Sequence, residues 1–87
     1  MKNHYVEVRQ VGYACFDTKP TQRKVALALA EFFAKNFTKT NPNAKVYRDA
    51  EASRVEVGFG DLEITVYRDS GKEDKPDTDI RYIVITK

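Results

Sequence analysis

His4 and Cys15 are the two side chains of this sequence best suited to nucleophilic or acid–base chemistry, and each is the single residue of its type. A nucleophilic cysteine needs a base within hydrogen-bond reach. Both residues fall in one predicted strand, where a rise of about 3.3 Å per residue separates them by roughly 36 Å. They therefore cannot pair within one chain, although two chains of an oligomer could still bring them into contact. We expect Cys15 to be a small buried hydrophobic residue.

Five acidic residues lie between Asp69 and Asp79 and suggest oxygen ligands for calcium or magnesium. The spacing does not fit an EF-hand loop. Counted from Asp69, the sixth position is Asp74, where that loop requires glycine, and the twelfth is Ile80, where it requires glutamate. The segment Asp69 to Asp79 therefore predicts a mobile surface loop and no metal site.

Other catalytic and cofactor sites lack their residues. One cysteine and one histidine cannot supply the three or four ligands of a zinc ion. No acidic residue stands in an apolar segment of the kind that tunes a carboxyl group for acid–base catalysis. Gly58-Phe59-Gly60 opens no helix and so differs from a phosphate-binding loop. The sequence predicts no cofactor and no enzymatic activity.

The length of 87 residues allows one domain, 1–87, with one core. A content of 41% hydrophobic residues excludes a disordered chain. No apolar run approaches the ~18 residues of a membrane helix, and residues 1–5 lack the apolar stretch of a signal peptide. A single cysteine needs no oxidising compartment. We expect a cytoplasmic protein that does not bind membranes.

The elements follow from periodicity and turn residues. Residues 5–16 alternate in the manner of a half-buried strand, with a bend at Gly12. Proline at position 20 starts a helix that ends near residue 38, before Pro42. Strands follow at about 44–49 and 53–59, a hairpin turn at Gly60 leads into a third, and residues 80–86 form the last.

The order β-α-β-β-β predicts an α+β fold in which a single helix packs on one face of a mainly antiparallel sheet of four to five strands. The strands that follow the helix are expected to form a meander. On a helical wheel, the core-facing residues are Val25, Leu29, Phe32, Phe33 and Phe37.

Basic residues gather at the start of the helix. Lys19, Arg23 and Lys24 stand there without an acid in the first two turns, opposing the usual pairing of negative charge with the helix N-terminus. Arg48 and Arg54 could extend this patch. The pattern suits either contact with nucleic-acid phosphates or an ordinary solvated helix face.

Apolar residues outside the predicted core form a second unusual group. Leu27 projects about 160° from Leu29 on the wheel and is expected to face water. In the last strand Ile83 and Ile85 point away from the helix-facing side chains, so both faces of that strand are apolar. Either loops and neighbouring side chains cover them, or they lie in an interface with another chain.

Binding is better supported by the sequence than catalysis. The first hypothesis is a non-enzymatic protein-binding module, a small regulator or inhibitor of the type carried by phages and mobile elements, which pairs with another protein or with itself as a homodimer. Leu27, Ile83 and Ile85 are its candidate contact residues. The alternative is a nucleic-acid-binding module that uses the basic helix start.

Overall fold

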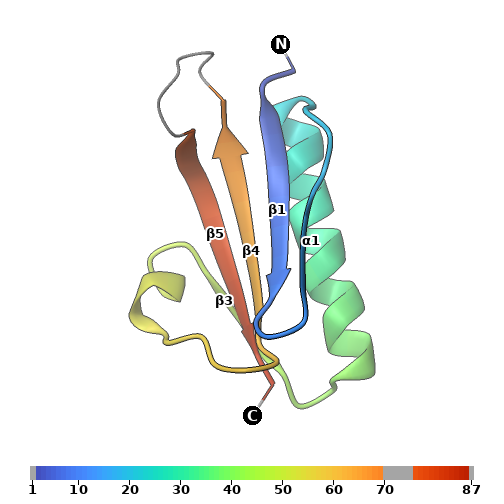
Figure 1. Cartoon of the computed structure of the whole chain (residues 1–87), viewed down its shortest axis with the longest axis vertical. Coiled ribbons are helices and arrows are strands. Elements are labelled where there is room, and N and C mark those ends of the chain that lie inside the picture. Colours follow the sequence, from blue (N-terminus) through green and yellow to red (C-terminus); the bar gives the residue numbers. More distant parts are fainter. Residues whose placement is uncertain (1, 70–75, 87) are drawn as a thin grey trace.

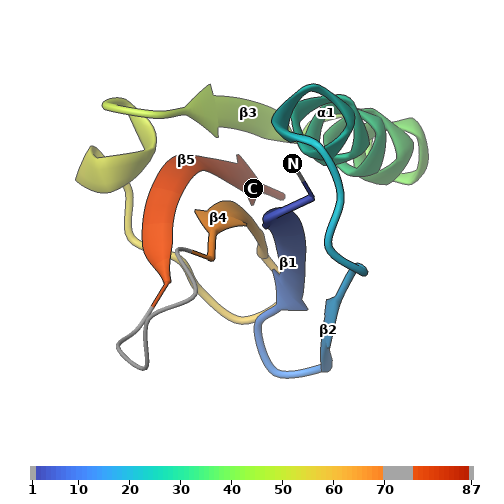
Figure 2. The same ribbon diagram turned by 90° about the horizontal axis from the view of Figure 1, so that it is seen from above.

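The computed structural model describes residues 2–69 and 76–86, which form one helix and a five-stranded antiparallel sheet (Figure 1). In chain order the elements are β1 (His4–Gln10), β2 (Ala14–Asp17), α1 (Arg23–Thr40), β3 (Lys45–Arg48), the 3-10 helix η1 (Ala52–Arg54), β4 (Leu62–Arg68) and β5 (Asp77–Ile85). Seen from above, the sheet curves around α1, which covers one of its faces (Figure 2). The predicted α+β class, with a single helix on one face of an antiparallel sheet, is confirmed.

The segment expected to be one strand, residues 5–16, is a hairpin of β1 and β2. The Tyr13 N–H donates a hydrogen bond to the Gln10 carbonyl at 2.9 Å. Between them Gly12 has φ +85°, a conformation that glycine adopts without steric cost. A Cβ atom on Gly12 would also lie 2.3 Å from the Phe59 ring. The predicted bend at Gly12 is therefore a full reversal of the chain.

The strand order is β2-β1-β4-β5-β3, so β1 lies inside the sheet and β3 forms the edge beside β5. The expected meander is wrong, because residues 53–59 do not form a strand. Ser53 Oγ donates to the Ala50 carbonyl, and the Val55 N–H donates to the Ala52 carbonyl. These local hydrogen bonds build η1 in place of a sheet ladder.

The last strand is longer than predicted and includes residues expected in the acidic loop. β5 begins at Asp77 and pairs along its length with β4. Asp79 therefore belongs to the sheet. Residues 70–75 of the predicted loop lie outside the described residues.

The helix packs on the sheet through small residues. Ala26, Ala30 and Ala34 are fully buried and recur every fourth position, so they form one stripe against β1, β4 and β5. Val25 and Phe32, both predicted to face the core, are instead 41% and 57% exposed. Alanine lets the helix backbone approach the sheet closely, and this moves the larger side chains to the flanks of the helix.

One flank carries Leu27, which was expected to face water and which instead packs against the core. The other flank carries Leu29, Phe33 and Phe37, which are partly buried against the core as predicted. The wheel therefore predicted one flank of the buried side correctly, but the centre of that side lies at the alanine stripe.

On the other face of the sheet, η1 lies beside β5 (Figures 1 and 2). Ala52 of η1 and Ile83 of β5 are both fully buried. Asp61 holds the preceding turn in place, because its carboxylate accepts hydrogen bonds from the Gly58 N–H and from the Thr86 N–H and hydroxyl. The chain itself therefore covers Ile83.

Candidate protein-binding surface

Strand β2 is an open edge of the sheet. It pairs with β1 on one side, and within the described residues no other strand borders it. The Thr18 N–H donates to the Val6 carbonyl at 2.8 Å. Because bonded pairs alternate along an antiparallel ladder, Phe16 and Ala14 also direct their main-chain groups toward β1. Cys15 and Asp17 therefore direct their N–H and C=O groups outward, where a further strand could bond to them.

The opposite edge, β3, is less accessible to another strand. The Arg48 carbonyl already accepts a hydrogen bond from the Glu51 N–H. Charged residues, Lys45 and Arg48, stand at both ends of this four-residue strand. Basic side chains on an edge strand oppose pairing with other chains. In β2, by contrast, all four residues are exposed and none is basic.

An aromatic groove lies between β2 and α1. The Phe16 ring of β2 meets the Phe33 ring of α1 edge to face at 5.6 Å between centroids, and Phe33 meets Phe32 at 5.8 Å. Phe16 is 50% exposed. Beside these rings is a cavity of about 400 Å³, lined by Val8, Phe16, Phe33, Asn36, Phe37, Lys39, Thr40 and Leu62. The groove thus joins the open strand edge to an apolar wall.

The helix flank that borders this groove is uncharged apart from Lys39 in the last turn. Six residues fall within an arc of about 100° on the wheel: Val25, Leu29, Phe32, Phe33, Asn36 and Thr40. A solvated helix face normally carries charged side chains, as the other flank of α1 does with Glu31 and Lys35. Val25 and Phe32 of this flank are exposed apolar residues, and a group of such residues is typical of an interaction site.

A second aromatic pair stands at the β1–β2 turn. Tyr13 and Phe59 are 67% and 70% exposed, and their ring centroids lie 5.1 Å apart. Phe59 rests on Gly12, which ties the turn before β4 to the turn before β2. The two aromatic groups therefore lie at the start of β2 and alongside it.

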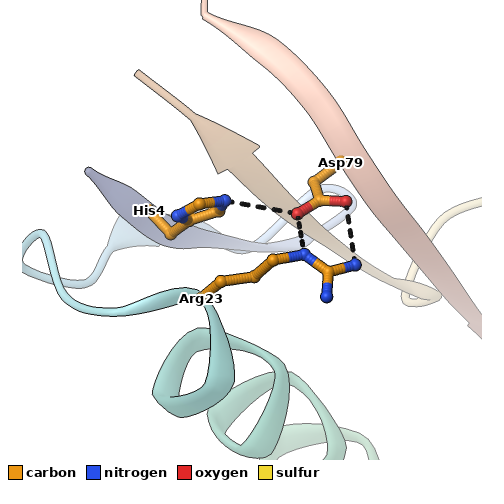
Figure 3. A network of polar contacts seen from close by, with 3 residues as sticks. All are labelled: His4, Arg23 and Asp79. Carbon is orange, nitrogen blue, oxygen red and sulfur yellow. Dashed lines mark hydrogen bonds and ion pairs between the residues drawn. The ribbon is translucent and has the colours of Figure 1, made fainter. Parts of the chain in front are cut away.

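A polar cluster joins the start of α1 to the sheet (Figure 3). Arg23 donates two hydrogen bonds to the carboxylate of Asp79, from Nε at 2.8 Å and from Nη2 at 3.3 Å. His4 Nε2 lies 3.3 Å from Asp79 Oδ2. The Arg23 hydrogen bonds are the main reason that the pKa of Asp79 lies below its ordinary value. The cluster thus links β1, α1 and β5.

A cleft of about 540 Å³ lies beside this cluster and is lined by Asn3, His4, Arg23, Arg68, Asp77, Thr78 and Asp79. His4 Nδ1 is buried and has no hydrogen-bond partner among the described residues. The two arginines of the cleft are matched by two aspartates, so the cleft presents no excess of either charge. Its geometry is that of a structural link between elements.

The structure separates the five basic residues proposed as an anion site. Arg23 is paired with Asp79, and Arg48 donates two hydrogen bonds to Glu31, at 3.0 and 2.8 Å. The Arg48 hydrogen bonds are the main cause that lowers the pKa of Glu31. Arg54 lies on η1, away from α1 (Figure 1). Lys19 and Lys24 are exposed, and both lie close to the helix start in the sequence.

The apolar candidates are mostly covered. Ile83 is fully buried, and Leu27 packs against the core. Ile85 is partly buried at the end of β5. Of the two explanations for the apolar outer side of β5, the structure shows the one in which the chain covers Ile83 itself. Exposed apolar surface lies instead at Phe16 and Phe32. The helical wheel predicted Phe32 to face the core, and the predicted long strand included Phe16.

The described residues do not bring His4 and Cys15 together as a catalytic pair. They include no group of three or more His, Cys, Asp or Glu side chains placed to hold a metal ion. Cys15 is exposed on β2, so its predicted burial is wrong. It lies opposite Arg9 in the β1–β2 register, roughly 17 Å along β1 from His4. Desolvation, followed by the charge of Glu7, raises the pKa of the Cys15 thiol, which disfavours the reactive thiolate.

Within the described residues, helix α1 is not apolar enough to cross a membrane. Comparison of the chain with protein-family models, with curated proteins and with solved structures finds no match.

Proposed function

We propose that this chain is a non-enzymatic protein-binding module of the regulator or inhibitor type, and that it binds an extended segment of another protein at the edge of β2. The observation that carries the proposal is the open edge of β2 beside an exposed aromatic groove. The main-chain groups of Cys15 and Asp17 supply hydrogen bonds, and the groove at Phe16 and Phe33 accepts apolar side chains. This is binding by β-strand addition.

Burial of apolar surface favours binding, as it favours folding. A phenylalanine ring that is half exposed still loses roughly 100 Å² of surface when a partner covers it. At about 25 cal/mol per Å², each such ring of the groove contributes about 2 kcal/mol before the entropy cost of association. Main-chain hydrogen bonds to the open edge align the segment, and they replace bonds to water at little net cost.

Binding through β2 is tested with a seven-residue peptide that alternates valine and threonine, observed by NMR chemical shifts of the protein amides. Cys15→Pro removes an N–H that points away from β1, so the substitution removes none of the hydrogen bonds between β1 and β2. Cys15→Val keeps that N–H and is the matched control. We expect millimolar or tighter binding (Kd of about 1 mM) with shifts at Cys15 and Asp17 in the native and Cys15→Val proteins, and at least a tenfold loss in Cys15→Pro.

An unchanged affinity of a folded Cys15→Pro protein, or an absence of shifts in β2, would contradict the proposal. Circular dichroism checks that the proline variant keeps the fold. Light scattering of the protein alone tests a second copy as the bound partner, since a homodimer formed at this edge must also dissociate in Cys15→Pro.

The alternative function, nucleic-acid binding, is favoured by one observation at the helix start. Gln22 precedes α1 without a side-chain cap within the described part of the chain, and the exposed residues Lys19 and Lys24 lie within three positions of it in the sequence. Phosphates bind such helix ends. This alternative predicts binding of short DNA or RNA that falls steeply with salt and is lost in Lys19→Ala/Lys24→Ala, while Cys15→Pro has no effect.

The proposal includes a cytoplasmic location. Cys15 supports it, because its thiol is free and exposed. A reducing compartment keeps an exposed thiol in that state.

A further inference from the structure

From the charges along β2 we infer the chemistry of its partner: an extended segment in which apolar residues alternate with basic ones, so that a basic side chain lies opposite Asp17. The inference rests on the proposed function and specifies the partner of that same edge. It depends on the two faces of β2, which differ in character.

One face of β2 is apolar and looks toward α1. Phe16 lies on it, in contact with Phe33, and Phe16 is opposite Val8 of β1. Side chains of a strand added to β2 alternate between the two faces in step with those of β2. A residue opposite Phe16 therefore enters the groove beside Phe33 and Phe37, where an apolar side chain is required.

The other face of β2 is acidic at its open edge. Asp17 lies directly opposite Glu7 of β1 in the antiparallel register. Neither carboxylate forms an ion pair with any described residue. Like charges directly opposite each other on a sheet are destabilising, and an opposite charge on the next strand relieves this.

Two arginines of this face share a single carboxylate, and neither forms an ion pair with Asp17 or Glu7 among the described residues. Arg9 of β1 and Arg81 of β5 both pair with Glu63 of β4. Arg9 lies opposite Cys15. Asp17 and Glu7 are thus carboxylates without an ion pair among the described residues. The edge therefore selects a cation at one position of the added strand and an apolar residue at the neighbouring one.

A second copy of this chain meets the requirement poorly. When β2 pairs with its own copy about Phe16, each Asp17 faces a Cys15 of the other copy, and when it pairs about Asp17 two carboxylates face each other. Lys19, which follows β2, could in principle supply the cation. Between Thr18, opposite Val6, and Thr21, opposite His4, however, the register with β1 shifts by one residue. This shift interrupts the regular ladder at Lys19. The edge therefore fits a different protein better than itself.

Two peptides of seven residues test this inference. Both carry valine at alternate positions, with lysine between the valines in one and glutamate in the other. The net charge of the protein is +2, so general attraction favours the glutamate peptide. We expect the lysine peptide to bind roughly tenfold more tightly, with NMR shifts at Cys15 and Asp17, and we expect Asp17→Asn to remove most of this preference.

The controls separate the two proposals. Asp77→Asn, which removes a carboxylate of similar exposure on β5, should leave the preference unchanged. If both peptides bind equally, or the glutamate peptide binds more tightly, the inference of a basic partner is wrong. If Cys15→Pro then abolishes binding of both peptides, strand addition at β2 is still supported. Binding of neither peptide at β2 overturns both proposals. A preference for lysine that persists in Asp17→Asn and in Asp17→Asn/Glu7→Gln also overturns the inference.

Discussion

At the scale of single residues, Asp79 shows how a side chain from a presumed loop links three elements. It lies on β5, accepts hydrogen bonds from Arg23 of α1 and contacts His4 of β1 (Figure 3). Its side chain is 19% exposed, and that of Arg23 is 56% exposed. The pair is therefore screened by water, and its contribution to the stability of the fold is small.

The stabilisation by Asp79 depends on pH. Its pKa is lowered in the folded state from the ordinary 3.8, mainly by the hydrogen bonds from Arg23. The stabilisation is therefore complete above the unfolded pKa and is lost as the pH falls through the folded one. We expect Asp79→Asn to lower the free energy of unfolding by about 1 kcal/mol at pH 7, and the difference from native protein to shrink as the pH falls below 3.8.

Urea unfolding at pH 7 and at a series of pH values below 3.8 measures this difference. Asp77→Asn on the same strand is the control, and its effect at pH 7 should stay within about 0.5 kcal/mol. A difference between Asp79→Asn and native protein that is independent of pH would show that the carboxylate charge plays no part.

Gly12 and Gly60 form a matched pair, because both have positive φ, +85° and +87°. A Cβ at Gly12 meets the Phe59 ring, whereas a Cβ at Gly60 meets no described atom within 4 Å. We expect Gly60→Ala to cost about 1 kcal/mol for the backbone alone, and Gly12→Ala to cost about 1 kcal/mol more. Thermal unfolding of Gly12→Ala/Phe59→Ala, in which the ring is removed, should recover that difference. Equal costs at the two glycines would contradict the contact.

At the scale of elements, the alanine stripe of α1 determines which side chains remain for binding. Ala26, Ala30 and Ala34 bring the helix close to the sheet and turn Phe32 outward. We expect Ala30→Leu to destabilise the fold by about 1–3 kcal/mol, since the close contact leaves no space for a larger side chain. Ala28→Leu, on the exposed side of the helix, should change stability by less than about 0.5 kcal/mol. Denaturant unfolding compares them, and similar costs would exclude tight packing at the stripe.

The two edge strands also differ as elements. β3 ends in charged residues and is followed closely by η1, whereas β2 offers the main-chain groups of Cys15 and Asp17. An open edge that carries aromatic residues risks aggregation unless a partner covers it. The contrast within one sheet is the reason that strand addition is assigned to β2.

At the scale of the whole molecule, the small size of the chain makes a partner energetically important. A domain of 87 residues buries only about 60–65% of the surface of its unfolded chain. Among the described residues, exposed apolar side chains gather where β2, the aromatic groove and one flank of α1 meet, and they include Phe16, Val25 and Phe32. Charged pairs such as Arg48 with Glu31 lie on the opposite flank of the helix. This asymmetry separates a binding side from a solvated side.

Local pattern by itself determined the helix, the strands β3, β4 and β5 and the α+β class. Alternation in residues 62–68 and the repeat of apolar residues in 23–40 depend on the geometry of a single segment, and that geometry can be inferred from the order of residues. The turn at Gly12 was also visible, as a bend. Strand order was not, because pairing partners are separated by up to about 60 residues and several registers satisfy the same alternation.

Tertiary structure alone decided that the alanine stripe is the buried centre of α1, that Ile83 is covered, and that β2 is an open edge. The wheel favoured large apolar residues for the core, whereas close packing of two layers selected alanine. The basic residues were visible in the sequence, but their pairing with Glu31 and Asp79 depended on contacts between distant segments. The candidate site could not be predicted for the same reason: it consists of what the packed elements leave exposed.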